Sequence, residues 1–164
     1  MKLVIINGSA ESGKDKFIEF IQFSTSGVVN FSTIDPVKEA LRHLGWNGKK
    51  TDEDRKWMAD TKKRWIQRYN GDGCVNWVEN IYNENIYNAY YKLMFIHCRE
   101  PEEIEKIVKR IPTAVTLLIR RPNSKVLKNG ADDVVENYKY DYVIENDGDL
   151  EDLKNKAHEF MLKM

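Results

Sequence analysis

The chain has 164 residues, of which 41% are hydrophobic and 32% are charged. Lys plus Arg number 26 and Asp plus Glu also number 26, so the formal net charge is zero. This length is enough to bury a core without disulfides or metals, and it predicts one domain over residues 1–164. The balanced charge argues against nucleic acid or an anionic membrane as a partner, and it leaves a homodimer open.

The apolar runs are too short for a secretory signal or a membrane span. After Met1 only Leu3–Ile6 are continuously apolar before Asn7. The two cysteines, Cys74 and Cys98, lie far apart and have no metal-ligand spacing around them. We therefore expect a soluble, cytoplasmic protein with ordinary thiols.

Strand and helix patterns alternate through the first part of the chain. In chain order, the patterns predict a strand at 2–7, a helix at 14–24, a strand at 28–33, and helices at 36–45, 52–69 and 74–90. Asp35 is the predicted N-cap before Pro36, and Thr51 with Asp54 forms a capping box. The apolar residues expected on the buried face of the 52–69 helix are Trp57, Met58, Trp65, Ile66 and Tyr69.

The same alternation continues to the C-terminus. The patterns predict strands at 92–98, 113–119 and 140–146, and helices at 99–112 and 149–164. Strands that alternate with helices indicate a parallel sheet with helices on both faces. We therefore predict a three-layer α/β/α fold.

The segment "NGSAESGKDKF" at 7–17 has the glycine and lysine spacing of a phosphate-binding loop between a strand and a helix. Backbone N–H groups of such a loop surround phosphate oxygens, and the lysine adds a positive charge. A purely structural turn is the alternative. The residues predicted to bind ATP in this loop are Gly8, Ser9, Ala10, Glu11, Ser12, Gly13, Lys14 and Asp15.

Asp15 stands where the usual phosphate-loop pattern has Ser or Thr. A carboxylate beside a triphosphate is repelled unless Mg²⁺ lies between the two groups. Asp15 is therefore the predicted metal ligand, and ATP and Mg²⁺ are the predicted cofactors.

The segment "GSAESGKD" resembles the variant loop, ending in Gly-Lys-Asp, of phage-type deoxynucleoside monophosphate kinases and animal-type phosphomevalonate kinases. "TIDPVKEALRHLG" and "KTDEDRKWMADTKKRW" are similar to later segments of that group, and "HCREPEEIEKI" matches its "DxRxxxE" stretch at Arg99 and Glu103. "YDYVIENDGDLEDLKNK" resembles the closing strand and helix shared with dephospho-CoA kinases. The resemblance implies a P-loop kinase domain with a helical acceptor-binding segment at 36–91 and a lid-like segment at 120–138.

The resemblance also implies roles for cationic residues, because phosphoryl transfer needs positive charges that converge from several elements. Arg99 follows a strand end and joins Lys14 and Asp15 as a predicted catalytic residue, and Arg120, at another strand end, is predicted to bind ATP. The predicted acceptor-binding residues are Asp35, Lys38, Arg42, Arg55, Arg64 and Arg68. Solvated surface charge is the alternative for each helical arginine.

His97 departs from the family pattern, which has a magnesium-site Asp at this position. A neutral histidine at the end of a buried strand is typically a hydrogen-bonded core residue, so Asp15 or Asp35 would have to organise the metal. The leading hypothesis is a phosphotransferase that uses ATP and Mg²⁺ on a (deoxy)nucleoside monophosphate. A phosphomevalonate or dephospho-CoA kinase-like enzyme and a nucleotide-binding module with little catalytic activity are the alternatives.

Overall fold

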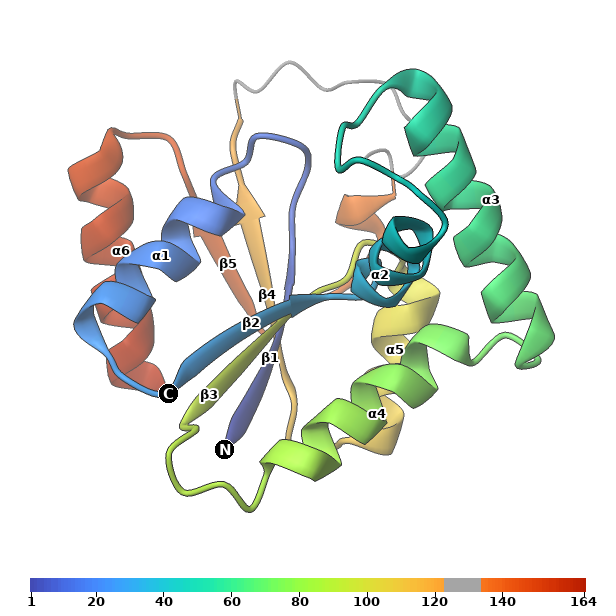
Figure 1. Ribbon diagram of the computed structural model, residues 1–164. Helices are drawn as coiled ribbons and strands as arrows, with labels where there is room; N and C mark the ends of the chain where they lie inside the picture. Colours follow the sequence, from blue (N-terminus) through green and yellow to red (C-terminus); the bar gives the residue numbers. More distant parts are fainter. Residues whose placement is uncertain (123–133) are drawn as a thin grey trace.

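The computed structural model describes residues 1–122 and 134–164. Its strands form one parallel sheet in the order β2-β3-β1-β4-β5 (Figure 1). The strands are β1 (Lys2–Asn7), β2 (Val28–Ser32), β3 (Leu93–His97), β4 (Val115–Arg120) and β5 (Tyr142–Glu145). The chain builds β2 and β3 on one side of β1 and then β4 and β5 on the other. A crevice forms at the carboxyl end of the central strand in sheets that are wound this way.

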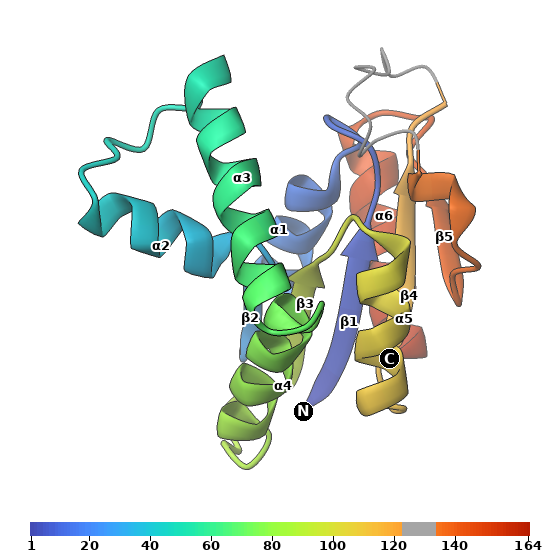
Figure 2. The same cartoon turned by 90° about the vertical axis from the view of Figure 1, so that its right-hand side faces the viewer.

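Helices cover both faces of the sheet, as the alternating pattern predicts. The helices are α1 (Lys14–Ser24), α2 (Asp35–His43), α3 (Asp52–Arg68), α4 (Gly73–Asn85), α5 (Pro101–Arg110), α6 (Leu150–Lys163) and the short 3-10 turn η1 (Val135–Asn137). Helices α1 and α6 lie on one face, and α4 and α5 lie on the other (Figures 1 and 2). The predicted three-layer α/β/α fold is confirmed.

The central strand β1 shows why its sequence is apolar at consecutive positions. Successive side chains of a strand point to opposite faces of the sheet. Leu3 and Ile5 pack in the core under α4 and α5, whereas Val4 and Ile6 pack in the core under α1 and α6. All four side chains are fully buried. Burial on both faces removes the alternation between polar and apolar residues that a half-exposed strand would show.

Helices α2 and α3 form a smaller apolar cluster outside the main layers (Figure 2). The prediction of a broad buried face on α3 is wrong, because only Met58 of the helix is buried. Trp57 is 40% exposed and Tyr69 is 54% exposed. Since α3 packs beside α2 and the start of α4 and not on the sheet, only a narrow stripe of its surface is covered.

Several predicted boundaries differ from the structure, among them the start of α2 and the end of α4. Asp35 is the first residue of α2, and Ile34 is the N-cap residue. The Asp35 carboxylate does not cap the helix but accepts a hydrogen bond from the backbone N–H of Ser32, which precedes it, at 2.6 Å. Helix α4 ends at Asn85, before the predicted end at Tyr90. The capping box of Thr51 and Asp54 is confirmed.

Part of the lid-like segment predicted at 120–138 lies outside the described residues. Across residues 1–122 and 134–164, no helix combines the length and apolar character that crossing a membrane requires.

Candidate active site

The predicted phosphate loop, residues 8–13, connects β1 to α1 and needs glycine at both of its ends. Gly8 has a φ of +151°, and a Cβ there would lie 2.4 Å from the carbonyl oxygen of Ile119. Gly13 has a φ of +98°, and a Cβ there would lie 2.5 Å from Nδ2 of Asn146. Any side chain would therefore strain the backbone and collide with a neighbouring segment. These contacts press the loop against β4 and against the residue that follows β5.

Lys14 folds back over the loop that precedes it. Its Nζ donates hydrogen bonds to the carbonyl oxygens of Gly8 and Ser9, both at 2.7 Å, and lies 3.3 Å from Oγ of Ser12. The ammonium thus lies over the loop, beside the N-terminus of α1. A helix N-terminus and an ammonium group at the same place favour the binding of an anion.

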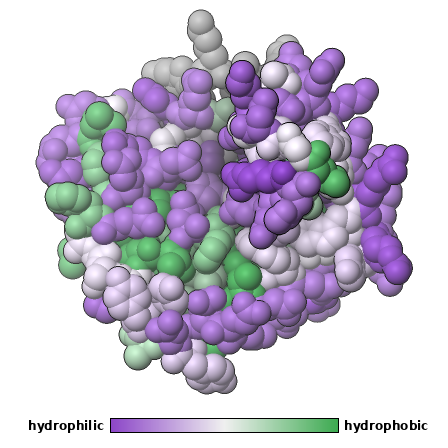
Figure 3. All heavy atoms as spheres, in the orientation of Figure 1, coloured by the Kyte–Doolittle hydropathy of each residue, from purple (hydrophilic) through white to green (hydrophobic). Residues whose placement is uncertain are grey.

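A cleft of about 620 Å³ extends from the phosphate loop to α2 and α3. Lys14 and Asp15 line one wall, the residues after β3 line the floor, and Lys38 and Arg55 line the opposite wall. Hydrophilic residues dominate the upper part of this face, between the phosphate loop and α3 (Figure 3). A smaller hollow of about 210 Å³ lies between β5 and α6, away from the loop. The larger cleft is the candidate active site, because it joins the phosphate loop to the helical segment.

His97 and Asp15 face each other at the floor of the cleft, with Nε2 of His97 lying 3.6 Å from Oδ1 of Asp15. The His97 side chain is 16% exposed, and burial lowers its pKa to about 4 although the Asp15 charge acts in the opposite direction. The imidazole is therefore neutral at neutral pH. His97 was expected to be a core residue; its side chain is mostly buried and also lines the cleft.

Asp15 has the chemistry that a magnesium ion requires. Its carboxylate lies in the first turn of α1 and is 94% exposed, and carboxylate oxygens are preferred ligands of Mg²⁺. Both carboxylate oxygens of Asp35, by contrast, already accept hydrogen bonds, from the Ser32 N–H at 2.6 Å and from Lys38 at 2.8 Å. Of these two acids, Asp15 is the better candidate ligand.

The second wall of the cleft comes from one face of α3. Its lining residues are Arg55, Met58, Ala59 and Lys62. This spacing brings them to one side of the helix, whereas Arg64 lies roughly 180° around the axis from Arg55. Arg64 and Arg68 are exposed and lie outside the cleft lining that the described residues form. Arg42 is also outside that lining, with its guanidinium 5.6 Å from the ring of Trp46.

The two strand-end arginines differ in position. Arg99 follows β3 and lines the cleft. Arg120, at the end of β4, forms ion pairs with Glu136 and with Glu145, and the Nη1 to Oε1 distance to Glu145 is 2.7 Å. Hydrogen bonds to these two carboxylates raise the pKa of Arg120 above its ordinary value. The neighbouring Arg121 instead reaches the phosphate loop, where its Nη1 donates to the carbonyl of Glu11 at 3.4 Å.

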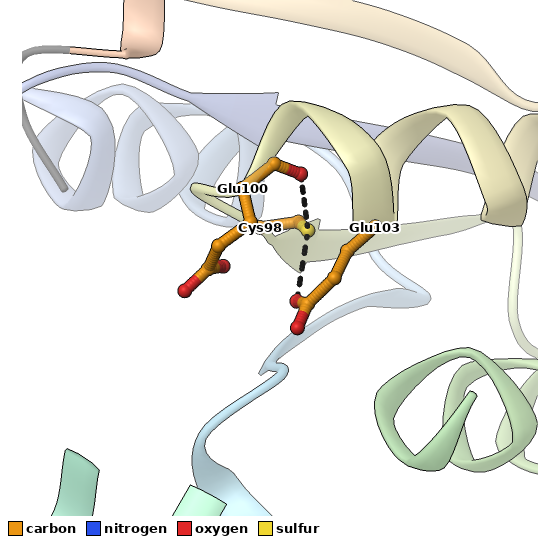
Figure 4. Close-up of side chains that lie close together, drawn as sticks. All are labelled: Cys98, Glu100 and Glu103. Carbon is orange, nitrogen blue, oxygen red and sulfur yellow. Dashed lines mark hydrogen bonds between the residues drawn. The ribbon is translucent and has the colours of Figure 1, made fainter. Parts of the chain in front are cut away.

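A buried charged cluster joins α3 to the floor of the cleft. Lys62 Nζ lies 2.8 Å from Glu100 and 3.1 Å from Glu103, and Cys98 Sγ contacts Glu103 at 3.6 Å (Figure 4). Burial opposes the charge of Lys62, but Glu103 and Glu100 more than compensate and raise its pKa. Burial raises the pKa of Glu103 and that of Cys98. Because the Lys62 ammonium already contacts both carboxylates and the thiol is protonated, we assign the cluster to an ion-pair network and not to a metal.

Several polar residues of the site were not selected from the sequence. Asn146, after β5, donates from Nδ2 to the carbonyl of Ser12 at 2.9 Å, and Asn7 contacts Gly8. Lys50 and Lys62 line the cleft and were also not selected from the sequence. A systematic search for polar residues at the carboxyl ends of the predicted strands would have found both asparagines.

No model of a protein family matches the sequence, and no curated protein matches it either. Solved structures do match nearly the whole chain. A sugar kinase from Janibacter sp. HTCC2649 superposes with a TM-score of 0.59 at 13% identity, covering 98% of this chain and 94% of that one. TT1252 from Thermus thermophilus gives 0.55 at 17% identity, covering 99% and 97%.

The APS kinase of Mycobacterium tuberculosis is also similar, with a TM-score of 0.51 at 13% identity, and the alignment covers 98% of this chain and 96% of that one. At such identities the likeness concerns the fold alone. Together with the five-stranded parallel sheet and its order, it shows that this chain has the α/β/α fold of P-loop kinases.

Proposed function

We propose that this chain is a phosphotransferase that uses ATP and Mg²⁺ to phosphorylate a small phosphorylated acceptor, a (deoxy)nucleoside monophosphate. One observation carries the proposal. The cleft has the phosphate loop with Lys14 on one wall and the cleft-lining side of α3, with Arg55, on the other. Two cationic walls across one cleft suit a donor triphosphate and an acceptor phosphate that must meet in line.

The donor site consists of the phosphate loop, with Lys14 assigned to the β- and γ-phosphates and Asp15 to the metal. Bound Mg²⁺ would neutralise charge on the phosphate oxygens. Arg99 lies between the two walls and is assigned to the transferring group. Arg121, which already contacts the loop, is a better candidate than the ion-paired Arg120 for a further donor contact.

The acceptor site consists of Lys38, Arg55 and Lys50, with Asp35 orienting Lys38 through their 2.8 Å ion pair. Phe31 also lines the cleft and offers an aromatic surface on which a base can pack. His97, in place of the expected acid, is the observation that favours the alternative of a nucleotide-binding module with little turnover.

Turnover of ATP tests the proposal. The purified protein would be assayed for ADP release with deoxynucleoside and nucleoside monophosphates, phosphomevalonate and dephospho-CoA, with and without Mg²⁺. We expect Mg²⁺-dependent release with one of the monophosphates, and its loss in a folded Lys14→Ala variant. Release with phosphomevalonate or dephospho-CoA alone would replace the acceptor assignment. ATP binding without turnover would favour the non-catalytic module.

A further inference from the structure

We infer that Asn7 is a positioning residue that holds both Lys14 and Arg99 in place for phosphoryl transfer. The inference rests on the proposed function. Asn7 is the last residue of β1, and its side chain is fully buried. A buried amide that is not hydrogen-bonded would destabilise the fold, so the partners of this side chain define what it does.

The partners of Asn7 come from three different segments. Its Oδ1 accepts a hydrogen bond from the backbone N–H of Gly8 at 2.8 Å. Its Nδ2 donates to the carbonyl of Arg99 at 3.1 Å and to the hydroxyl of Tyr140 at 2.7 Å. A backbone N–H can only donate and a carbonyl can only accept, so these partners fix which end of the amide faces which segment.

Gly8 links Asn7 to Lys14, because it is hydrogen-bonded to both side chains. The N–H of Gly8 is held by Asn7, and the carbonyl of Gly8 accepts a hydrogen bond from Lys14 Nζ at 2.7 Å. The conformation of Gly8 therefore sets the direction of the carbonyl that receives the ammonium. Loss of the Asn7 contact would let the start of the loop rotate, and the position of the Lys14 charge would change with it.

The contact with Arg99 acts on the opposite side of the site. Arg99 follows β3, and its backbone carbonyl is tied to the end of β1 through the Asn7 amide. The backbone pairing of β1 with β3 extends to Ile6 and His97, and the Asn7 side chain adds a further link between the start of the phosphate loop and the segment that carries Arg99. A shift of about 1 Å in a positioning contact can lower the rate of a reaction by two orders of magnitude.

Tyr140 completes the network and provides the matched control. Its hydroxyl donates to the carbonyl of Val135 at 2.8 Å while it accepts from Asn7. Burial raises the pKa of Tyr140 to about 12, so the hydroxyl keeps its proton at neutral pH. Tyr140→Phe removes hydrogen bonds from the same network but leaves the contacts of Asn7 with Gly8 and Arg99 intact.

The test compares Asn7→Ala with Tyr140→Phe and the wild type. Binding of a non-hydrolysable ATP analogue with Mg²⁺ would be measured by calorimetry, and thermal unfolding would be followed in parallel. We expect Asn7→Ala to weaken analogue binding roughly tenfold, the loss that about one hydrogen bond of ordinary strength represents. Tyr140→Phe should lower the melting temperature comparably and change the affinity less than about threefold.

Kinetics adds a measurement that a purely structural role would not affect. In Asn7→Ala we expect kcat to fall while KM for the acceptor stays at the wild-type value, because the α2 and α3 wall is untouched. If Asn7→Ala does not fold, Asn7→Ser keeps a small polar group at the strand end and is measured in the same way, with the same expected losses.

Two outcomes would overturn the inference, and a third concerns the function. Equal loss of affinity in the Asn7 and Tyr140 variants would make Asn7 an ordinary member of a structural network. A folded Asn7 variant with wild-type affinity and kcat would remove its positioning role. Failure of the wild type itself to bind the ATP analogue would instead contradict the proposed function on which the inference rests.

Discussion

Substitution of Lys62 should reveal the buried charge network that ties α3 to the core. Lys62→Met keeps the length of the side chain but removes the ammonium from between Glu100 and Glu103. The side chains of Lys62 and Glu103 are only 12% and 11% exposed, so breaking this pair leaves a carboxylate without a counter-charge in a poorly solvated place. We expect the variant to be clearly less stable than the wild type at pH 7.

The expected loss of unfolding free energy follows from the exposure of Glu103 and Glu100, the two partners of Lys62. Removing one member of a buried ion pair costs about 3–5 kcal/mol. The Glu100 side chain is 42% exposed, and water screens such a contact, so it adds at most about 1 kcal/mol. Because Glu103 already has a raised pKa and can take up a proton when the ammonium is gone, we place the total near the lower end, about 3 kcal/mol. For a chain of this size this corresponds to a melting temperature about 6–12 °C lower.

Urea denaturation at pH 7 and again at pH 5 would measure this loss, with Lys63→Met on the exposed side of α3 as the matched control. The loss in Lys62→Met should be smaller at pH 5 than at pH 7, because the raised pKa of Glu103 favours uptake of a proton as the pH falls, and a protonated carboxyl needs no counter-charge. The double variant Lys62→Met with Glu103→Gln should recover about 2 kcal/mol relative to the sum of the single changes. If Lys62→Met is no less stable than Lys63→Met, the ion pairs contribute nothing measurable and the reasoning fails.

The remaining predictions concern the cleft itself. Asp15→Asn should raise the Mg²⁺ concentration needed for half-maximal turnover about tenfold, because a neutral amide is a weaker ligand for a hard cation, and an unchanged Mg²⁺ titration would exclude Asp15 from the metal site. Arg55→Ala should raise KM for the acceptor about tenfold with little change in ATP binding. Arg64→Ala, on the far side of α3, should change KM for the acceptor much less. Similar kinetics for the two variants would contradict the assignment of the α3 wall to the acceptor. His97 has a folded pKa of about 4 against an ordinary 6.5, so the unfolded chain takes up a proton first as the pH falls, and stability should drop between pH 6.5 and 4 by at most about 3 kcal/mol. Metal-free denaturation of His97→Gln should show a flatter pH dependence over that interval, and an identical profile would mean that the imidazole is protonated as easily in the folded chain as in the unfolded one.

The layered fold and the phosphate loop could be predicted from local patterns. A strand buried on both faces must be apolar at consecutive positions, as at Leu3–Ile6, and a helix that covers a sheet must repeat its apolar residues every three to four positions. The loop was recognisable because its glycines and Lys14 have a characteristic spacing between a strand pattern and a helix pattern. These properties depend on the chain within a few residues of each position, so they can be read from the sequence alone.

The arrangement of charged side chains depended on tertiary structure. The sequence placed four arginines on α2 and α3 but did not show that Arg55 alone among them faces the cleft, because the orientation of α3 is set by its packing against α2 and α4. It also could not pair Lys62 with Glu103, or Asn7 with Tyr140, since these partners are far apart along the chain. A side-chain contact of this kind is decided by which segments the folded core brings together, and no local pattern carries that information.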